Sequence, residues 1–118
     1  MVRVLVVDDE PAVGRALSRV LAAHGFEVRT CTSGRDALDC LREWPASSVL
    51  SDFQMPEMNG VQLLAQVKQA WPRTRRVLVS ALADTLHPVA LEPCAPCTVV
   101  AKPWREEELL LILRSEEP

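Results

Sequence analysis

The chain has 118 residues, of which 48% are hydrophobic and 25% charged, and its formal net charge at pH 7 is −3. This length predicts one domain that can bury a core of its own. The negative balance argues against nucleic-acid binding, which needs a concentrated positive surface. No apolar run approaches the ~20 residues that a membrane-spanning helix requires.

The first residues run from aliphatic directly into acidic, which is not the layout of a signal peptide. We therefore expect a cytoplasmic protein that binds neither nucleic acid nor membrane. The only tight basic group is Arg73, Arg75 and Arg76, and its position before an aliphatic run predicts a solvated loop.

Short aliphatic runs alternate with amphipathic stretches along the chain. A strand is predicted at 4–7, where four consecutive apolar residues suit a parallel strand covered on both faces. Residues 10–24 carry apolar side chains at helical spacing, and a glycine follows them. A weaker strand is predicted at 26–30, and Ser33-Gly34 begins the next helix.

The next two units are built alike. Trp44-Pro45 and Trp71-Pro72 each end a helix, because a proline disfavours helical geometry in the residue before it. A polar connector and an aliphatic strand follow each pair, and these strands end at Asp52 and Ser80. Between the two strands, Asn59-Gly60 is interpreted as a turn that opens a helix.

The last part of the chain is less regular. Residues 98–101 are predicted to form the fifth strand, and 104–114 the last helix. The fourth helix should lie within 84–92, yet three prolines crowd that region. Because a proline inside a helix costs ~3 kcal/mol, we expect this helix to be short, kinked or partly unwound, and mobile.

The alternation of strands and helices predicts an α/β fold: a single domain of five βα units with a parallel sheet covered by helices on both faces. In such sheets, ligands bind beyond the carboxyl ends of the strands. That edge would bring together three carboxylates, one hydroxyl and one amine. These are Asp8, Asp9, Asp52, Ser80 and Lys102.

The charges at this edge predict a metal site. Two carboxylates ~4 Å apart repel by about 4 kcal/mol at an effective dielectric near 20, and one lysine cannot compensate three of them. Oxygen ligands indicate Mg²⁺. Asp52 could then attack phosphorus to give an acyl phosphate, with Lys102 neutralising the transferring group and Ser80 bonding to one of its oxygens. Alternatively, Asp9 only caps the first helix and Ser80 is an ordinary hydroxyl at a strand end.

Four motifs carry a family resemblance: DDE at 8–10, DFQMPEMNG at 52–60, SA at 80–81 and KPW at 102–104. Together they resemble the receiver domain of bacterial two-component response regulators. The resemblance implies a flavodoxin-like, CheY-like doubly wound sheet of strand order 2-1-3-4-5.

The resemblance also implies residue roles. Asp52 is the phosphoacceptor, and Asp8, Asp9 and Asp52 bind Mg²⁺ together with the backbone carbonyl of Gln54. Ser80 and Lys102 are the switch hydroxyl and the site lysine. Pro103 matches the cis-proline of the family.

The sequence also departs from the family pattern. Val99 stands where receivers usually carry an aromatic switch residue, and a valine cannot swing a ring in and out. Ala95-Pro96 replaces the usual Gly-Ala before the fifth strand. Gln54 and Leu82 flank the expected phosphoryl position and are interpreted as residues that tune the lifetime of the phosphorylated state.

The resemblance implies partners for a domain that spans residues 1–118. A sensor histidine kinase or phosphotransfer protein would supply the phosphoryl group, and an output domain or partner protein would read it. A homodimer through the face of the fourth helix, fifth strand and fifth helix is also allowed. The domain would catalyse only its own phosphorylation and dephosphorylation, so it is not an enzyme with a separate substrate.

Two other functions remain as alternatives. Cys94 and Cys97 have the C-x-x-C spacing of redox motifs, which would suit a redox-responsive interaction module without phosphorylation. Reduced structural thiols are favoured, because the pair precedes a strand; His87 lies near, but a zinc site would need a fourth ligand. A Mg²⁺-dependent aspartyl phosphohydrolase of the haloacid dehalogenase type would need an aspartate two residues after the nucleophile, where Gln54 stands.

Three further expectations concern packing. Cys31 and Cys40 are interpreted as small apolar packing residues. The run 109–113 is apolar around more of the helix than one sheet can bury. It therefore predicts either a deeply covered helix or a face for a dimer partner or output domain.

Overall fold

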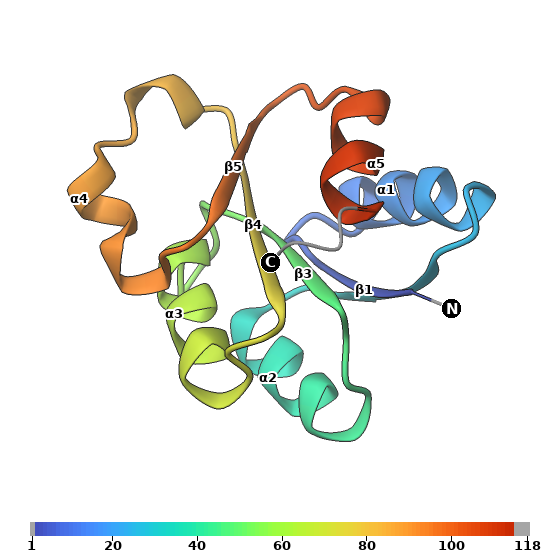
Figure 1. Cartoon of the computed structure of the whole chain (residues 1–118), viewed down its shortest axis with the longest axis horizontal. Helices are drawn as coiled ribbons and strands as arrows, with labels where there is room; N and C mark the ends of the chain where they lie inside the picture. The colour runs from blue at the N-terminus through green and yellow to red at the C-terminus, as the bar shows by residue number, and fades with distance from the viewer. Residues whose placement is uncertain (1, 115–118) are drawn as a thin grey trace.

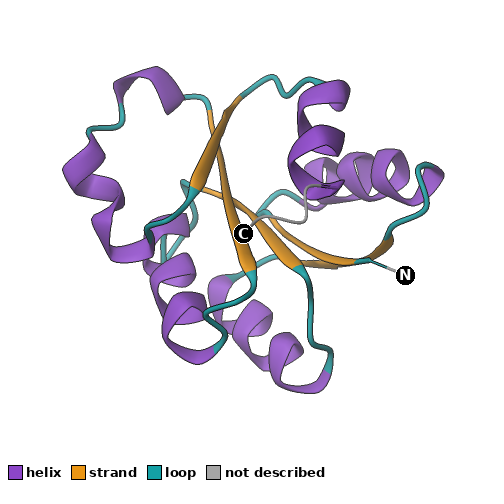
Figure 2. Cartoon of the chain, in the orientation of Figure 1, coloured by secondary structure: helices purple, strands orange, loops and turns teal. Residues whose placement is uncertain are grey.

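The computed structural model describes residues 2–114 of the chain. Figure 1 shows a central sheet with helices on both sides, and Figure 2 separates helices, strands and loops. The strands are β1 (Arg3–Val7), β2 (Glu27–Cys31), β3 (Ser48–Asp52), β4 (Arg75–Ser80) and β5 (Thr98–Ala101). The α-helices are α1 (Pro11–Ala23), α2 (Gly34–Glu43), α3 (Gly60–Ala70), α4 (Pro88–Leu91) and α5 (Glu106–Arg114).

The strands are all parallel and lie in the order β2-β1-β3-β4-β5, which confirms the predicted α/β fold and strand order. From β1 the chain moves outward to β2 and then returns past β1 to form β3. This reversal is the topological switch point, where a crevice opens at the carboxyl ends of the two central strands.

Two hydrophobic layers hold the helices against the sheet. Alternate residues of β1 point to opposite faces: Val4 and Val6 pack with α1 and α5, whereas Leu5 and Val7 pack with α2 and α3. All four are essentially inaccessible to solvent. An unbroken aliphatic run is therefore what a strand buried on both faces requires.

The helix ends follow the signals in the sequence. Trp44 and Trp71 close α2 and α3, each donating its backbone N–H to a carbonyl of the last turn. At the start of α3, Asn59 and Gln62 form a reciprocal capping box with two bonds of 2.9 Å. α5 begins at Glu106, two residues later than predicted, so that three acidic residues occupy the positive end of the helix dipole.

The fourth helix is short and broken, as predicted. α4 spans one turn, flanked by the 3₁₀ segments η1 (Ala83–Thr85) and η2 (Glu92–Cys94). In Figure 1 this region arches away from the sheet, unlike the other helices. Between residues 2 and 114, no helix is both long and apolar enough to cross a membrane.

The expectation of a solvated basic loop was wrong for Arg76. This residue lies in β4 and is only 5% exposed. Its guanidinium donates to four carbonyls, those of Pro72, Thr74, Cys94 and Pro96. A buried cation is tolerated here because oxygen acceptors surround it, and it ties β4 to the segment before β5.

Candidate functional site

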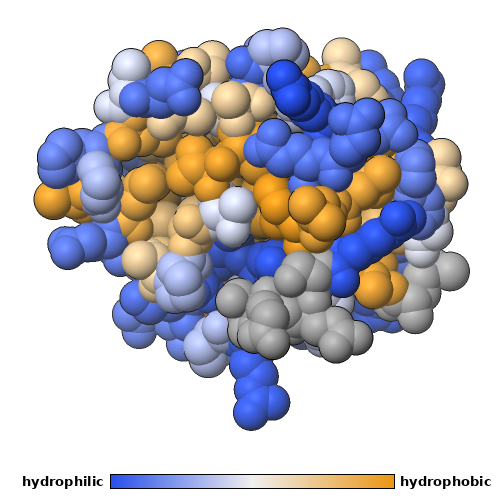
Figure 3. Space-filling model, turned by 45° about the horizontal axis from the view of Figure 1, so that its top comes forward, coloured by the Kyte–Doolittle hydropathy of each residue, from blue (hydrophilic) through white to orange (hydrophobic). Residues whose placement is uncertain are grey.

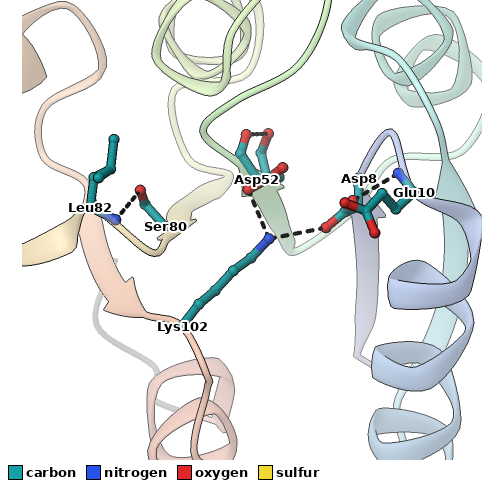
Figure 4. Close-up of polar contacts among 7 residues, drawn as sticks. Asp8, Glu10, Asp52, Ser80, Leu82 and Lys102 are labelled. Carbon is teal, nitrogen blue, oxygen red and sulfur yellow. Dashed lines mark hydrogen bonds and ion pairs between the residues drawn. The ribbon is translucent and has the colours of Figure 1, made fainter.

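Four strand ends deliver polar side chains to one edge of the sheet. Asp8 directly follows β1, Asp52 ends β3, Ser80 ends β4 and Lys102 directly follows β5. Figure 4 shows Lys102 extended between them, with Asp52 between Ser80 and Asp8, as the strand order requires. The structure thus brings together residues that are far apart in the sequence.

Three carboxylates form the acidic part of this edge. Asp8, Asp9 and Asp52 each offer an oxygen atom, and these atoms lie within 4.8 Å of one another. Asp8 is buried at 4% exposure, and the side chain of Asp52 is 12% exposed. At such separations, anionic groups repel strongly unless a cation compensates them.

Lys102 supplies one compensating charge. Its Nζ donates to Oδ1 of Asp52 at 3.0 Å and lies 3.5 Å from Oδ2 of Asp8. The backbone N–H of Lys102 donates to the carbonyl of Ser80 at 3.0 Å, which fixes the residue beside β4. One ammonium group therefore bridges the carboxylates of β1 and β3.

The site shifts the protonation of Asp52 and Lys102 in ways that follow from burial and charge. Burial raises the pKa of Asp52, and the charges of Asp8 and Asp9 add to this against the opposing effect of Lys102. Burial alone would lower the pKa of Lys102, but its bond to Asp52 and the charges of Asp52 and Asp8 outweigh it and raise the value. The single positive charge of Lys102 therefore does not balance the three carboxylates of the acidic cluster.

The donor set fits a divalent cation. Three carboxylate groups face one ammonium, so negative charge remains in excess at the point where their oxygens converge. Hard oxygen ligands of this kind suit Mg²⁺, which binds through one or two carboxylates and retains several waters.

The alternative that Asp9 caps α1 finds no support. The N-cap residue of α1 is Glu10, and its side chain makes no capping bond. The amide of Glu10 instead donates to Oδ1 of Asp8 at 2.9 Å. Asp9 is thereby left at the acidic cluster.

Ser80 lies at the same edge and is 2% exposed. Its Oγ accepts the amide N–H of Leu82 at 2.9 Å, so the hydroxyl proton can be donated elsewhere. Leu82 itself is 40% exposed at the start of the loop after β4. The hydroxyl is therefore coupled directly to the backbone of that loop.

Gln54 and Val99 belong to the segments after β3 and within β5, which end at this edge of the sheet. Gln54 is exposed in the loop after β3, two residues beyond Asp52. Val99 lies opposite Leu78 in the β4–β5 ladder and packs on the layer formed with α2 and α3. Val99 therefore connects β5 to the hydrophobic core on that face of the sheet.

Gly60 is a site residue that sequence reasoning read only as part of a turn. Its amide donates to the carbonyl of Phe53 at 2.8 Å, and a Cβ atom here would collide with the backbone oxygen of Asp52. The start of α3 therefore packs directly beneath the nucleophile candidate. Such a close approach depends on the path of the loop, which motif spacing does not show.

The cysteines are reduced thiols. Cys94 is fully buried, whereas Cys31, Cys40 and Cys97 are half-buried. His87 is exposed, and its Nδ1 accepts the amide of Val89 at 3.1 Å, so its ring serves as a helix cap. Over residues 2–114, the only cluster of three or more potential metal ligands is the three aspartates.

Comparison with known proteins places this geometry in a family. The response regulator receiver domain family matches residues 4–114. The chain is 37% identical to the regulatory protein AtoC of Escherichia coli, covering 95% of the chain and 24% of AtoC. It is 33% identical to the transcriptional regulatory protein KdpE of Mycobacterium tuberculosis, covering 98% of the chain and 50% of KdpE. The chain thus spans a quarter to a half of these relatives.

Solved structures agree with the sequence matches. The chemotaxis protein CheY4 of Vibrio cholerae superposes with a TM-score of 0.85 at 26% identity, covering 96% of both chains. The signal receiver domain of an HD domain-containing protein from Pseudomonas fluorescens gives a TM-score of 0.83 at 26% identity, covering 96% of this chain and 91% of that one. With its sheet order, its site and these matches, the chain belongs to the response regulator receiver domain family.

Proposed function

We propose that the chain is a phosphoacceptor switch of a two-component phosphorelay, with Asp52 as the residue that carries the phosphoryl group. The observation that supports this best is the convergence of Asp8, Asp9 and Asp52 on one point, with Lys102 bonded to Asp52. A structural cluster of acids would not need its members at the open end of a crevice.

The proposed reaction is a transfer between two side chains. An Oδ atom of Asp52 attacks the phosphorus of a phosphohistidine on a sensor histidine kinase or phosphotransfer protein. The O–P bond forms as the N–P bond breaks, and the released imidazole nitrogen keeps the electron pair and takes up a proton. The product on Asp52 is an acyl phosphate, which water later hydrolyses to inorganic phosphate.

Lys102 and Ser80 are proposed to hold the transferred group. Nζ of Lys102 already contacts Asp52, so it can follow the negative charge onto a phosphoryl oxygen. The hydroxyl of Ser80 can donate to another phosphoryl oxygen while Oγ continues to accept from Leu82. The loop after β4 would then respond to the phosphoryl group through this one hydrogen bond.

Asp8, Asp9, Asp52 and the backbone carbonyl of Gln54 are the proposed ligands of Mg²⁺. When bound, the ion neutralises charge on the phosphoryl oxygens. Gln54 and Leu82, which are exposed in the loops after β3 and β4, would set how easily water reaches the acyl phosphate. Their side chains are the proposed tuning residues.

The surface of α4, β5 and α5 is proposed to carry the signal. Val89 and Leu111 expose apolar side chains there, at 62% and 76%, and Figure 3 shows apolar side chains gathered in a band across the face that it presents. An output domain, a partner protein or a second copy could use this face. Because Val99 carries no ring, the readout would depend on the loop from Ser80 rather than on an aromatic rotamer.

We further propose that residues 1–118 act as one cytoplasmic receiver unit that binds no nucleic acid and turns over no separate substrate. The net charge of −3 supports the absence of nucleic-acid binding, because phosphate groups would be repelled. The phosphohydrolase alternative is disfavoured because exposed Gln54 occupies the place where an acid/base carboxylate would be needed.

Acetyl phosphate with Mg²⁺ tests the proposed role of Asp52. Intact-mass measurement should show one added phosphoryl group on the wild type and none on Asp52→Asn. Asp39→Asn, on the exposed side of α2, is the control and should be labelled like the wild type. Equal labelling of the wild type and Asp52→Asn would remove Asp52 from this role.

A further inference from the structure

Ser51, which precedes Asp52 in β3, is a polar residue inside an apolar layer. It is 0% exposed and lies on the same face of the sheet as Val49, because residues two apart in a strand point to the same side. Val49 packs in the layer formed with α2 and α3. A hydroxyl buried in such a layer costs free energy unless it has a hydrogen-bond partner. The partner of this hydroxyl is therefore informative about why a serine stands here.

The hydroxyl of Ser51 helps to hold one peptide unit, the one that joins Asp52 to Phe53. Its Oγ donates to the backbone carbonyl of Asp52 at 2.9 Å, the only hydrogen bond that this Oγ makes within residues 2–114. The N–H of the same peptide unit belongs to Phe53 and donates to the carbonyl of Val79 at 3.1 Å. This peptide is therefore held at its oxygen by β3 and at its nitrogen by β4.

The start of α3 restricts the same carbonyl. A Cβ atom at Gly60 would collide with the backbone oxygen of Asp52, so the helix begins in close contact with that oxygen. The amide of Gly60 also donates to the carbonyl of Phe53 at 2.8 Å, which holds the next peptide unit. The carbonyl of Asp52 therefore has little room to turn while its bond to Ser51 is kept.

The direction of this peptide affects two groups of the proposed site. A rotation of the backbone at Asp52 would move its carboxylate relative to Nζ of Lys102, which lies 3.0 Å from Oδ1. It would also redirect the chain toward Gln54, whose backbone carbonyl is a proposed ligand of Mg²⁺. A misplacement of about 1 Å at a reacting group can cost about a hundredfold in rate. The hydrogen bond of Ser51 is therefore placed where it can control the geometry of the reaction.

The simpler explanation, that Ser51 only fills space, fits the position poorly. A valine suits a strand and would bury more apolar surface in the same layer, so it would stabilise the fold more than a serine does. The two preceding residues of β3 are indeed Val49 and Leu50. The hydroxyl thus stands beside Asp52 at some cost in stability.

We propose that Ser51 is a positioning residue for the phosphoacceptor. Its hydroxyl fixes the peptide between Asp52 and Phe53, and thereby orients the Asp52 carboxylate for attack on phosphorus. The same anchor directs the backbone carbonyl of Gln54 toward the metal. This inference rests on the proposed function of Asp52. Ser51 itself touches neither phosphorus nor metal and acts through the backbone.

The decisive pair of variants is Ser51→Thr and Ser51→Val, because threonine and valine have nearly the same shape and differ in the hydroxyl. Labelling by acetyl phosphate at saturating Mg²⁺ is followed over time by intact mass. Ser51→Val should be labelled about three- to tenfold more slowly than Ser51→Thr, the range expected for the loss of one hydrogen bond. Ser51→Thr should stay close to the wild type, because its hydroxyl can donate to the same carbonyl.

Two further measurements test the anchor without phosphoryl transfer. In the metal-free protein, the amide proton of Phe53 should exchange roughly three- to tenfold faster in Ser51→Val than in Ser51→Thr, as read by NMR. Amide protons in the middle of α3 should exchange alike in both variants. Titration calorimetry with Mg²⁺ alone should show weaker binding by Ser51→Val than by Ser51→Thr.

Ser48→Ala is the matched control, because Ser48 is also buried in β3 but lies at the end of the strand remote from Asp52. It should be labelled and should bind Mg²⁺ like the wild type. Valine and threonine both add bulk at a fully buried position, so Ser51→Ala serves as a second variant without a hydroxyl. It should behave like Ser51→Val, with urea unfolding used to show that each variant is folded under the labelling conditions.

Equal labelling rates in Ser51→Val and Ser51→Thr would refute the positioning role, whether or not the exchange of Phe53 differs. An equally slow Ser48→Ala would refute it as well, because the effect would then follow from a general loss of stability. An unlabelled wild type would instead contradict the proposed function of Asp52. In that case Mg²⁺ binding and the exchange of Phe53 would still decide whether Ser51 positions the backbone.

Discussion

Keeping the Asp52 carboxylate ionised costs free energy in the folded protein. Burial and the charges of Asp8 and Asp9 raise its pKa, although Lys102 opposes them. The folded state therefore binds a proton at Asp52 more tightly than the unfolded chain does. A carboxylate kept under such conditions is poised to accept a cation or a new covalent partner.

Asp52→Asn should make the metal-free protein more stable at neutral pH, by about 1 kcal/mol or less because solvent screens part of the interaction. The stabilising effect of protonated Asp52 is fully present below the ordinary pKa of 3.8 and is lost as pH rises through its raised value. The advantage of the variant should therefore vanish as pH falls below that ordinary value.

Urea unfolding in a chelator at several pH values measures this difference. Asp84→Asn, at an exposed position of η1, is the control and should change stability by less than about 0.5 kcal/mol at each pH. A wild type more stable than Asp52→Asn at neutral pH would contradict the prediction.

Gly60 and Gly14 should respond in opposite ways to the same added methyl group. Gly60→Ala brings a Cβ into the backbone oxygen of Asp52 and should cost about 3 kcal/mol. Gly14→Ala lies inside α1 with Thr30 no nearer than 3.8 Å, so it should stabilise by ~0.5–1 kcal/mol. Thermal unfolding compares them, and Gly60→Ala should also slow labelling by acetyl phosphate. Equal stability of the two variants would be inconsistent with this packing.

Some residues of the site could be predicted from the sequence and others could not. Asp8, Asp52 and Lys102 directly follow or end aliphatic runs, so the rule for parallel sheets places them at one edge. Arg76 was misplaced because the acceptors that make its burial tolerable come from Pro72 and from the turn before β5. A distant set of carbonyls leaves no local signal.

At the scale of elements, the fourth unit differs from the rest. Helices α1, α2 and α3 each have 10 or more residues, whereas α4 has 4. The prolines in this region predicted the interruption, because each removes a backbone donor and clashes with the preceding turn. What they could not predict is the anchor that Arg76 provides at the end of the segment.

Hydrogen exchange should find little protection across residues 84–95 and strong protection within α3. The broken segment has few repeating hydrogen bonds and mostly exposed residues, whereas Leu63, Leu64 and Val67 of α3 are fully buried. The two stretches can be compared in one experiment by mass spectrometry. Strong protection across 84–95 would show that this region is rigid despite its irregular form.

The apolar run of α5 was predicted to be either deeply covered or a face for a partner. The helix has one side buried and one side exposed. Leu109 and Leu113 are buried against the sheet, and Leu111 is 76% exposed. Leu109→Ala should therefore cost about 2–5 kcal/mol, whereas Leu111→Ala should stay within about 0.5 kcal/mol. Chemical denaturation checks both, and similar losses would mean that Leu111 is covered in solution by another surface.

At the scale of the molecule, Mg²⁺ should stabilise the fold through the acidic cluster. At ten times its dissociation constant, a ligand specific for the folded state contributes ~1.4 kcal/mol, or roughly 5 °C in Tm for a domain of this size. Scanning calorimetry with and without chelator measures the shift. Asp8→Asn should abolish most of it, and a Tm unaffected by Mg²⁺ in the wild type would rule out a metal held by these residues.

The whole fold was more predictable than its surface. Hydrophobic periodicity and the alternation of strands and helices determine the layers, because every strand of the sheet core needs cover on both faces. The strand order 2-1-3-4-5, which sets the position of the switch point, was predicted from the family resemblance rather than from periodicity. The turn between Cys94 and Cys97 is held by Arg76 through two backbone carbonyls, and the spacing of the two cysteines alone did not predict this.

The bridge from Lys102 to Asp8 joins the residues that directly follow the first and the fifth strand in chain order, which has a consequence for synthesis on the ribosome. β1 emerges first, yet its acid meets the lysine only after β5 has added to the edge of the sheet. A nascent chain that has released four strands therefore has the acids without their counter-charge. The partial charge balance of the acidic cluster is therefore reached only after β5 has been translated and has joined the sheet.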